Sequence, residues 1–355
     1  MTNNIKKRFH PGEFIKDGIE ALDITADQFA IRSGLTSKTV SQLINGQAKV
    51  NFGTAKKISA VIGGEPKTWL NLQNSYDLYL SELDNAKELE SQEEVAKLFP
   101  KNTLNILNIE LENNLITGKI KVLKSHFNVN NLNALKNPDF YNCCHHQSQK
   151  IETNDRQVVM QNAWINYIIT SAQKSPISTK IDLKKLKQSC GSLRKSSMES
   201  KEKILTEIKR ILNECGIMVV FSSYVPYSNI SGFTKWTKDR ENVILGLNDS
   251  GKRLDKFFFT LFHEISHVLN GDKRYIHLTY TNAESNADQF AMNHLITHEE
   301  YNELLSLFRG VYTPIELKTF SDKLGIDFSI VLGRLAHEGL INHKDYSKYY
   351  KNFEI

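Results

Sequence analysis

The segment that most constrains this chain is 255–271, which contains His263-Glu-Ile-Ser-His267. This is the H-E-x-x-H spacing of zinc peptidases. Asp255 is a favourable N-cap before an apolar run and the Asn-Gly pair at the other end is a favourable stop, so a helix of about four turns is predicted. Apolar residues recur along one side of it, and the two histidines lie together on another face. One face would anchor the helix while the other binds a ligand.

The spacing of these polar residues suits a metal ion. Histidines four residues apart are neighbours on a helix, so His263 and His267 could both reach one Zn²⁺ at about 2.0–2.1 Å. Glu264 lies about 100° further round, where it is poorly placed to ligate but could act as general base toward a water activated by zinc. A third protein ligand is then required, with the fourth position left for water or substrate.

The next predicted helix, 282–291, supplies a candidate for the third ligand. Glu284 projects from its apolar side one turn before Ala287, and a carboxylate facing a core needs a metal or a hydrogen-bond partner. Asp288, four residues on, could accept the spare N–H of a ligand histidine and fix its tautomer. The alternative is that the histidines are ordinary, partly buried residues and that 284–288 is a solvated charged face. The helical context and the downstream carboxylate favour the metal site.

These segments resemble a known family. Phe258-Phe-Thr-Leu-Phe-His-Glu-Ile-Ser-His267 followed by Glu284-Ser-Asn-Ala-Asp-Gln-Phe-Ala291 is similar to the ImmA/IrrE family of bacterial zinc metallopeptidases. The resemblance implies a zincin-like domain in which zinc is the cofactor. It assigns the roles as follows: His263, His267 and Glu284 as metal ligands, Glu264 as catalytic base.

The resemblance extends to both sides of the zinc helix. Segments 230–236 and 243–247 resemble the family's strand pair, and 320–335 resembles its C-terminal helical segment. An edge strand near the metal could hold the substrate backbone by strand addition. No single group stands out as the oxyanion partner, for which the candidates of equal rank are His277, Tyr280, His294 and Arg334.

Composition places few limits on function. The 355 residues are 40% hydrophobic and 24% charged, as in ordinary globular proteins of two or three domains. No apolar run approaches 18 residues and the polar N-terminus has no signal-peptide pattern, which predicts a cytoplasmic protein that does not enter a membrane. Four cysteines fit a reducing compartment. The run Cys143-Cys-His-His146 is a weak metal candidate because adjacent ligands cannot all turn to one ion.

Residues 10–84 have the pattern of consecutive short helices. A helix at 25–33 is broken by Gly34, and another follows at 36–45. Two short helices joined through a glycine turn are the layout of a helix-turn-helix, whose second helix enters the major groove. Pro11 opens the preceding helix, for which the predicted apolar stripe is Phe14, Ile15, Ile19 and Leu22.

The charges in this region suit DNA. Segment 31–57 carries five cations and no acid, although the chain's net charge is only +5. Short polar side chains crowd the start and outer face of the second helix, where they could meet base edges and phosphates. The predicted DNA contacts are Arg32, Thr36, Ser37, Lys38, Thr39, Ser41, Gln42 and Lys49. By spacing alone, a small helical bundle that binds proteins is an equal alternative.

A second resemblance favours DNA binding. Pro11-Gly-Glu-Phe-Ile, Gln28-Phe-Ala-Ile-Arg-Ser-Gly-Leu-Thr and Val40-Ser-Gln-Leu-Ile-Asn-Gly-Gln-Ala-Lys resemble the HigA-type antitoxin domain of the lambda-repressor-like family. Such domains bind operator DNA, usually as dimers. The resemblance therefore implies operator DNA as a partner and a homodimer as the expected assembly.

Taken together, the patterns predict a multidomain protein that is mainly α with a small β-sheet. The expected parts are a helix-turn-helix domain at 1–84, a helical linker or scaffold at 85–200 and a zincin-like metallopeptidase domain at 201–355. In the last part, a helix at 204–212 and a strand at 217–221 precede the two strands named above.

The expected function is a DNA-binding transcriptional regulator fused to a zinc-dependent endopeptidase. Its protein substrate would be a partner repressor, antitoxin or toxin, as the resemblance rather than the spacing implies. One alternative is a non-enzymatic, antitoxin-like repressor that keeps the zinc fold as a sensor or partner-binding platform. A third is a peptidase that cuts its own chain to release the DNA-binding half.

Overall fold

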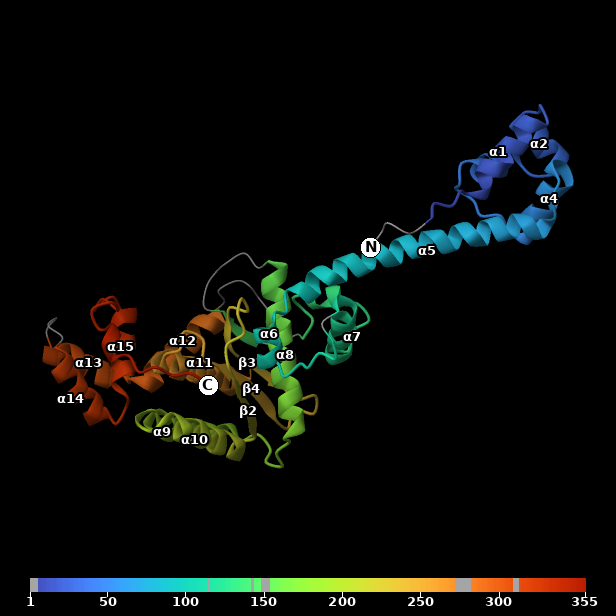
Figure 1. Ribbon diagram of the computed structural model, residues 1–355. Coiled ribbons are helices and arrows are strands. Elements are labelled where there is room, and N and C mark those ends of the chain that lie inside the picture. Colours follow the sequence, from blue (N-terminus) through green and yellow to red (C-terminus); the bar gives the residue numbers. More distant parts are fainter. Residues whose placement is uncertain (1–5, 114, 142–143, 148–153, 272–281, 309–312) are drawn as a thin grey trace. The chain divides into compact units, whose positions relative to one another are not determined.

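Figure 1 presents the computed structural model, which describes residues 6–113, 115–141, 144–147, 154–271, 282–308 and 313–355. The chain divides into two units, Met1–Gln92 and Glu93–Ile355. The boundary between them falls within one helix, α5 (Pro66–Lys97). Among the described residues, no helix combines the length and apolarity that crossing a membrane requires.

The first unit contains α1 (Pro11–Ala21), α2 (Ala26–Ser33), α3 (Ser37–Ile44), α4 (Phe52–Ile62) and the start of α5. Helix α2 begins in a capping box between Thr25 and Gln28, and it ends at Gly34, which adopts a left-handed conformation with φ 65°. Thr36 caps the start of α3. Local sequence therefore sets both ends of the turn between α2 and α3, and the predicted helix-turn-helix is confirmed.

Only two of the four residues predicted to form the apolar stripe of α1 are buried. Ile15 and Ile19 are buried, but Phe14 is 40% exposed and Leu22 is 42% exposed. The reason is that α1 approaches its neighbours through its glycines: a Cβ on Gly12 would strike the Leu43 carbonyl oxygen, and one on Gly18 would strike Ile62. The glycine side of α1 therefore faces the core, and Phe14 and Leu22 turn outward.

The second unit contains four strands and most of the helices. The strands are β1 (Cys144–Gln147), β2 (Ile217–Ser222), β3 (Ile230–Trp236) and β4 (Val243–Asn248). The helices before the last strand are α6 (Lys101–Ile106), α7 (Ile116–Phe127), η2 (Leu132–Lys136), α8 (Asp155–Lys174), α9 (Leu183–Lys195), η3 (Ser196–Met198) and α10 (Lys201–Glu214). Those after it are α11 (Leu254–Asn270), α12 (Asn282–Leu295), α13 (His298–Phe308), α14 (Pro314–Leu324), α15 (Phe328–His337) and η4 (Ser347–Tyr349).

The sheet has the strand order β1-β3-β4-β2. Strand β2 is parallel to β4, whereas β3 is antiparallel to both β4 and β1. The three predicted strands are present, but β1 was not predicted. It is short and lacks an apolar alternation, and it pairs through its backbone with the outer edge of β3. Three of the four residues of the Cys-Cys-His-His run belong to β1, and Cys143 lies outside the described residues.

Helices cover both faces of this sheet (Figure 1). On one face, Trp164 of α8 donates a hydrogen bond from Nε1 to Ser222 Oγ of β2 at 2.7 Å, and its ring packs edge-on against Phe233. On the other face, Gly232 of β3 lies against Thr260 and Glu264 of α11. Because β3 alternates its faces, Gly232 is the position that brings α11 onto the sheet.

Helices α8 and α9 therefore share a unit with α11, although the sequence analysis predicted that they belong to a scaffold at 85–200. Leu186 and Leu193 of α9 are fully buried in the same core as Phe258 and Leu261 of α11. The three-part division of the chain remains a prediction.

The packing of the sheet predicts opposite effects for two glycine substitutions. A Cβ on Gly246 would lie 2.8 Å from the Phe233 ring and 2.9 Å from Ile168 Cγ2, so we expect Gly246→Ala to cost about 1–3 kcal/mol through overpacking. Gly191 lies exposed within α9 with no atom in the way. Gly191→Ala should therefore stabilise by up to about 1 kcal/mol. Urea unfolding of both variants checks this, and equal midpoints would contradict it.

Candidate metal centre

The helix that carries H-E-x-x-H is α11, and it is enclosed by the fold. It ends at Gly271, which is left-handed with φ 66°, as the sequence predicts. The predicted N-cap is wrong: Arg253 occupies the cap position without a side-chain cap, and Asp255 lies in the first turn, where both of its carboxylate oxygens pair with Arg253. Asp255 therefore forms an ion pair with Arg253 and not a capping hydrogen bond to the start of the helix.

Three predicted ligands meet at one point. His263 Nε2 and His267 Nε2 lie 3.1 Å apart. The Glu284 carboxylate on α12 approaches both, with Oε2 3.3 Å from His263 Nε2 and Oε1 3.5 Å from His267 Nε2. One ligand atom from each residue lies within 4.8 Å of the other two, which makes this a candidate metal site.

These separations test whether a metal ion fits. Tetrahedral bonds of about 2.0–2.1 Å place two ligand atoms roughly 3.3 Å apart. The distances of 3.1, 3.3 and 3.5 Å therefore bracket the value for a shared zinc ion. Two imidazoles and one carboxylate are also a ligand set of catalytic zinc sites that keep one position open. The donors present thus fit the ion that the sequence predicts.

Asp288 reaches the opposite side of His263. His263 Nδ1 and Asp288 Oδ1 lie 2.8 Å apart, so the imidazole can donate there while Nε2 faces Glu284. Burial by itself lowers the pKa of His263, but the hydrogen bonds to Asp288 and Glu284 outweigh it and raise that pKa to about 9. Without a metal, this histidine is therefore protonated at neutral pH, and an ion binding at Nε2 must displace the proton.

Glu264 is fully buried one residue from the first histidine. Its side chain lies under β3, where a Cβ on Gly232 would be 2.9 Å from Glu264 Cγ and 3.0 Å from Oε1. Any larger residue than glycine at 232 would push this carboxylate away. This contact could not be predicted from the sequence, because nothing local relates Gly232 to Glu264.

Neither His294 nor Arg334, the two oxyanion candidates that the structure describes, belongs to the cluster. His277 and Tyr280 lie outside the described residues. His294 is stacked on Phe290 of its own helix, with ring centroids 3.7 Å apart, and its Nδ1 lies 2.9 Å from the Phe290 carbonyl oxygen. Arg334 lies over the Tyr301 ring and pairs with Glu338 at 3.0 Å.

The predicted DNA contacts of the first unit lie on and around α3. Thr36, Ser37, Lys38 and Ser41 are exposed, whereas Thr39 and Gln42 are half-buried. The Thr36 hydroxyl oxygen accepts a hydrogen bond from the Thr39 backbone N–H at 3.1 Å, so it is engaged in capping α3. The surface available to a ligand therefore centres on Ser37, Lys38 and Ser41.

The five cations of this region differ in their surroundings. Lys49 pairs with Asp77 at 2.8 Å, Lys57 donates to the Gly34 carbonyl oxygen at 2.7 Å, and Lys56 lies 5.5 Å from the centre of the Phe52 ring. Arg32 and Lys38 are exposed and form no ion pair within the described part of the chain. These two are the cations best placed to meet phosphates.

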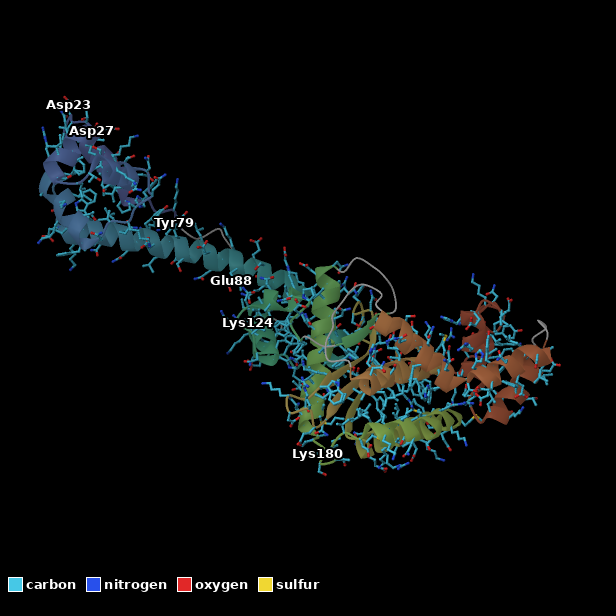
Figure 2. All side chains as sticks on the ribbon, turned by 180° about the vertical axis from the view of Figure 1, so that it is seen from behind. Asp23, Asp27, Tyr79, Glu88, Lys124 and Lys180 are labelled. Carbon is cyan, nitrogen blue, oxygen red and sulfur yellow. The ribbon has the colours of Figure 1, made fainter. Side chains whose placement is uncertain are left out.

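Two acidic residues, Asp23 and Asp27, lie at the end of α2 opposite to Arg32. Asp23 and Asp27 project into solvent at the beginning of α2, as Figure 2 shows, whereas Arg32 belongs to the last turn of that helix. The charge along α2 thus changes from negative to positive toward the turn that leads into α3.

Comparisons with known proteins agree with this two-part organisation. Residues 15–70 match the helix-turn-helix family, and residues 213–336, which include β2 to β4, α11 and α12, match the IrrE N-terminal-like domain of a peptidase family. Antitoxin HigA-1 of Vibrio cholerae is 38% identical over 80 residues, which are 22% of this chain and 75% of the antitoxin.

Two further relatives concern the same kind of domain. The uncharacterised HTH-type transcriptional regulator YddM of Escherichia coli is 37% identical over 68 residues, 19% of this chain and 72% of that protein. An addiction module antidote protein of a HigA family from Coxiella burnetii shares 29% identity, covering 24% of this chain and 95% of that structure with a TM-score of 0.23. The chain therefore belongs to the HigA-like helix-turn-helix family through its N-terminal domain, which is fused to a C-terminal domain of the IrrE N-terminal-like peptidase family.

Proposed function

We propose that this protein is a transcriptional regulator whose C-terminal domain is a zinc-dependent endopeptidase acting on a partner repressor, antitoxin or toxin. The observation that supports the enzyme most directly is the convergence of His263, His267 and Glu284 within 4.8 Å, with Glu264 buried beside them. The match to a peptidase family over 213–336 supports the same proposal.

In this proposal the two histidines and Glu284 hold the ion. Bound zinc would polarise the substrate carbonyl and bring the pKa of a water toward about 7. Glu264 accepts the proton of the attacking water and returns it to the leaving amine, as a general base and then a general acid. Asp288 keeps the Nδ1 proton on His263, so Nε2 is the nitrogen available as ligand.

Two other functions remain open for the same geometry. A non-enzymatic repressor would use the ligand cluster for sensing or partner binding, and it would not need a buried carboxylate at 264. A self-cutting peptidase would need the same base but would act on its own chain. The effect of replacing Glu264 therefore distinguishes the enzymatic proposals from the non-enzymatic one. The identity of the cleaved protein distinguishes the two enzymatic proposals from each other.

Replacing the base should abolish cleavage without removing the metal. Glu264→Gln keeps the shape of the buried side chain, so we expect turnover of a co-expressed partner to fall roughly 10²–10⁴-fold while zinc stoichiometry stays unchanged. Gel analysis of co-expressed neighbouring proteins, with metal analysis of the purified variant, measures both quantities. Glu299→Gln, an exposed carboxylate on α13, is the matched control. Unchanged processing in the Glu264 variant would remove the enzyme proposal.

Metal affinity should depend on pH and on Asp288. Because the His263 pKa is raised to about 9 in the metal-free protein, a proton competes with zinc at every pH below that value. Apparent zinc affinity should therefore rise with pH, by up to about tenfold per unit. Asp288→Asn should lower affinity about 10–100-fold at fixed pH. Competition with a chromogenic chelator between pH 6.5 and 8.5 tests both, and a flat profile would count against His263 as a ligand.

The N-terminal domain is proposed to bind operator DNA as a homodimer, with α3 in the major groove. The exposed Lys38 has no acidic partner within the described residues, whereas Lys49 is already paired with Asp77. We expect Lys38→Ala to weaken binding to the protein's own promoter and to reduce the salt slope by about 1. Lys49→Ala should change the slope less. Binding measured across a salt series decides this, and equal slopes for both variants would contradict the proposed surface.

A further inference from the structure

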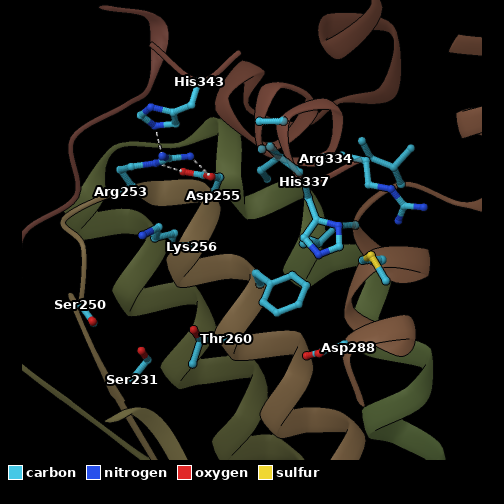
Figure 3. A pocket seen from close by; sticks show the side chains of 17 residues that line it. Ser231, Ser250, Arg253, Asp255, Lys256, Thr260, Asp288, Arg334, His337 and His343 are labelled. Atoms are coloured by element: carbon cyan, nitrogen blue, oxygen red, sulfur yellow. Dashed lines mark hydrogen bonds and ion pairs between the residues drawn. The ribbon is translucent and has the colours of Figure 1, made fainter. Parts of the chain in front are cut away.

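A cavity of about 550 Å³ lies beside the ligand cluster (Figure 3). Its walls come from the first half of α11, the second half of α12, α15 and the loop that precedes α11. The volume falls within the range of about 300–1,000 Å³ that is usual for ligand pockets. The cavity is therefore large enough to receive a side chain of a bound peptide together with water.

Two lining residues connect this cavity to the proposed active site. Asp288 lines it and contacts His263 through the 2.8 Å hydrogen bond. Thr260 also lines it and precedes Glu264 by one helical turn, and both of these side chains lie against Gly232. The cavity thus begins about 6 Å along the helix from the proposed base. Neighbouring residues of an extended peptide are about 3.3–3.6 Å apart, so a residue adjacent to the cut bond could reach it.

Among the charged side chains that line the cavity, one cation has no acidic partner within the described residues. Asp255 is paired with Arg253, and Asp288 is engaged with His263. Lys256 forms no ion pair with any residue that the structure describes. Its ammonium group lies near the turn at Gly251, where a Cβ would be 3.1 Å from Nζ. Figure 3 shows Lys256 on the same wall as Arg253 and Asp255.

Arg334 lies on the α15 side of the cavity, where its charge is paired with that of Glu338. Its Nε lies 3.0 Å from Glu338, while Nη1 is buried without a hydrogen-bond partner among the described residues. The rest of the wall is largely apolar, with Phe259, Met292 and Ile330 among its members. A ligand with a hydrocarbon stem and an anionic end matches this combination better than a purely apolar or a cationic side chain.

From this arrangement we infer that the cavity is a specificity pocket for an acidic side chain of the peptide substrate, glutamate above all. The carboxylate would pair with Lys256, and the methylene groups would pack against Phe259. The inference rests on the proposed endopeptidase function and adds a substrate class to it.

Binding to an inactive protein tests this pocket without requiring turnover. Full-length, zinc-loaded Glu264→Gln protein would be titrated with fluorescent hexapeptides that differ only in one central residue, glutamate, glutamine or lysine. Since Lys256 is solvent-exposed, we expect the glutamate peptide to bind roughly threefold to fivefold more tightly than the glutamine peptide. Adding Lys256→Glu should reverse the order in favour of the lysine peptide. Lys238→Glu, an exposed lysine between β3 and β4, is the control and should leave the order unchanged.

The possible outcomes separate the two proposals. Equal binding of the glutamate and glutamine peptides, or an order unaffected by Lys256→Glu, overturns the pocket. Binding of free glutarate or inorganic phosphate with the same dependence on Lys256 but without a peptide preference would assign the cavity to a free anion, and it also overturns the proposal. If the glutamate preference and its reversal are found while the wild-type protein cuts no substrate, the pocket stands and the endopeptidase function fails.

Discussion

The constraint on which the C-terminal unit depends is the burial of polar side chains between two helices. His263 and Glu264 are fully buried and His267 is 2% exposed, a costly arrangement unless each group finds partners. Glu284 and Asp288 of α12 supply partners for His263 from opposite sides of its ring. The apolar contacts that hold α12 against α11, including those of the fully buried Ala287 and Ala291, therefore also set the distances between His263, His267 and Glu284.

The sheet adds a second constraint, on the position of Glu264. Strand β3 can approach α11 closely because Gly232 has no side chain, and the Glu264 carboxylate lies in the space this leaves. On the opposite face, Phe233 and Gly246 form the corresponding contact with α8. In β3, Gly232 on one face is thus followed by Phe233 on the other. These two positions set how closely α11 and α8 pack against the sheet. Helix α8, in which the sequence showed no chemical motif, packs against the face of the sheet opposite to the site.

In the N-terminal unit, the structure determines which basic side chains are paired with acidic ones. Local caps at Thr25, Thr36 and Gly34 define the helices, but contacts within the unit neutralise part of the basic segment. Asp77, which pairs with Lys49, follows it by 28 residues. The pKa of Asp77 is held below its usual value, first by the hydrogen bond from Lys49. Lys57 donates to the Gly34 carbonyl oxygen and Lys56 lies over the Phe52 ring. Arg32 and Lys38, which have no such contact among the described residues, then define a smaller surface than the sequence alone suggested.

The sequence by itself determined the features that depend on short-range geometry. Most helix ends follow from caps and glycines within a few residues, although the start of α11 lacks the predicted cap. The helical period places His263 and His267 on one face, so their proximity was predictable, while the roles of His263, His267, Glu264, Glu284 and Asp288 remain predictions. The tertiary structure alone decided the pairing of β1 with β3, the outward turn of Phe14, the approach of Gly232 to Glu264 and the cavity at Lys256. Each of these joins residues distant in the chain, and hydrophobic periodicity carries no information about which distant surfaces meet. These features are therefore set by tertiary packing and not by the local preferences of the sequence.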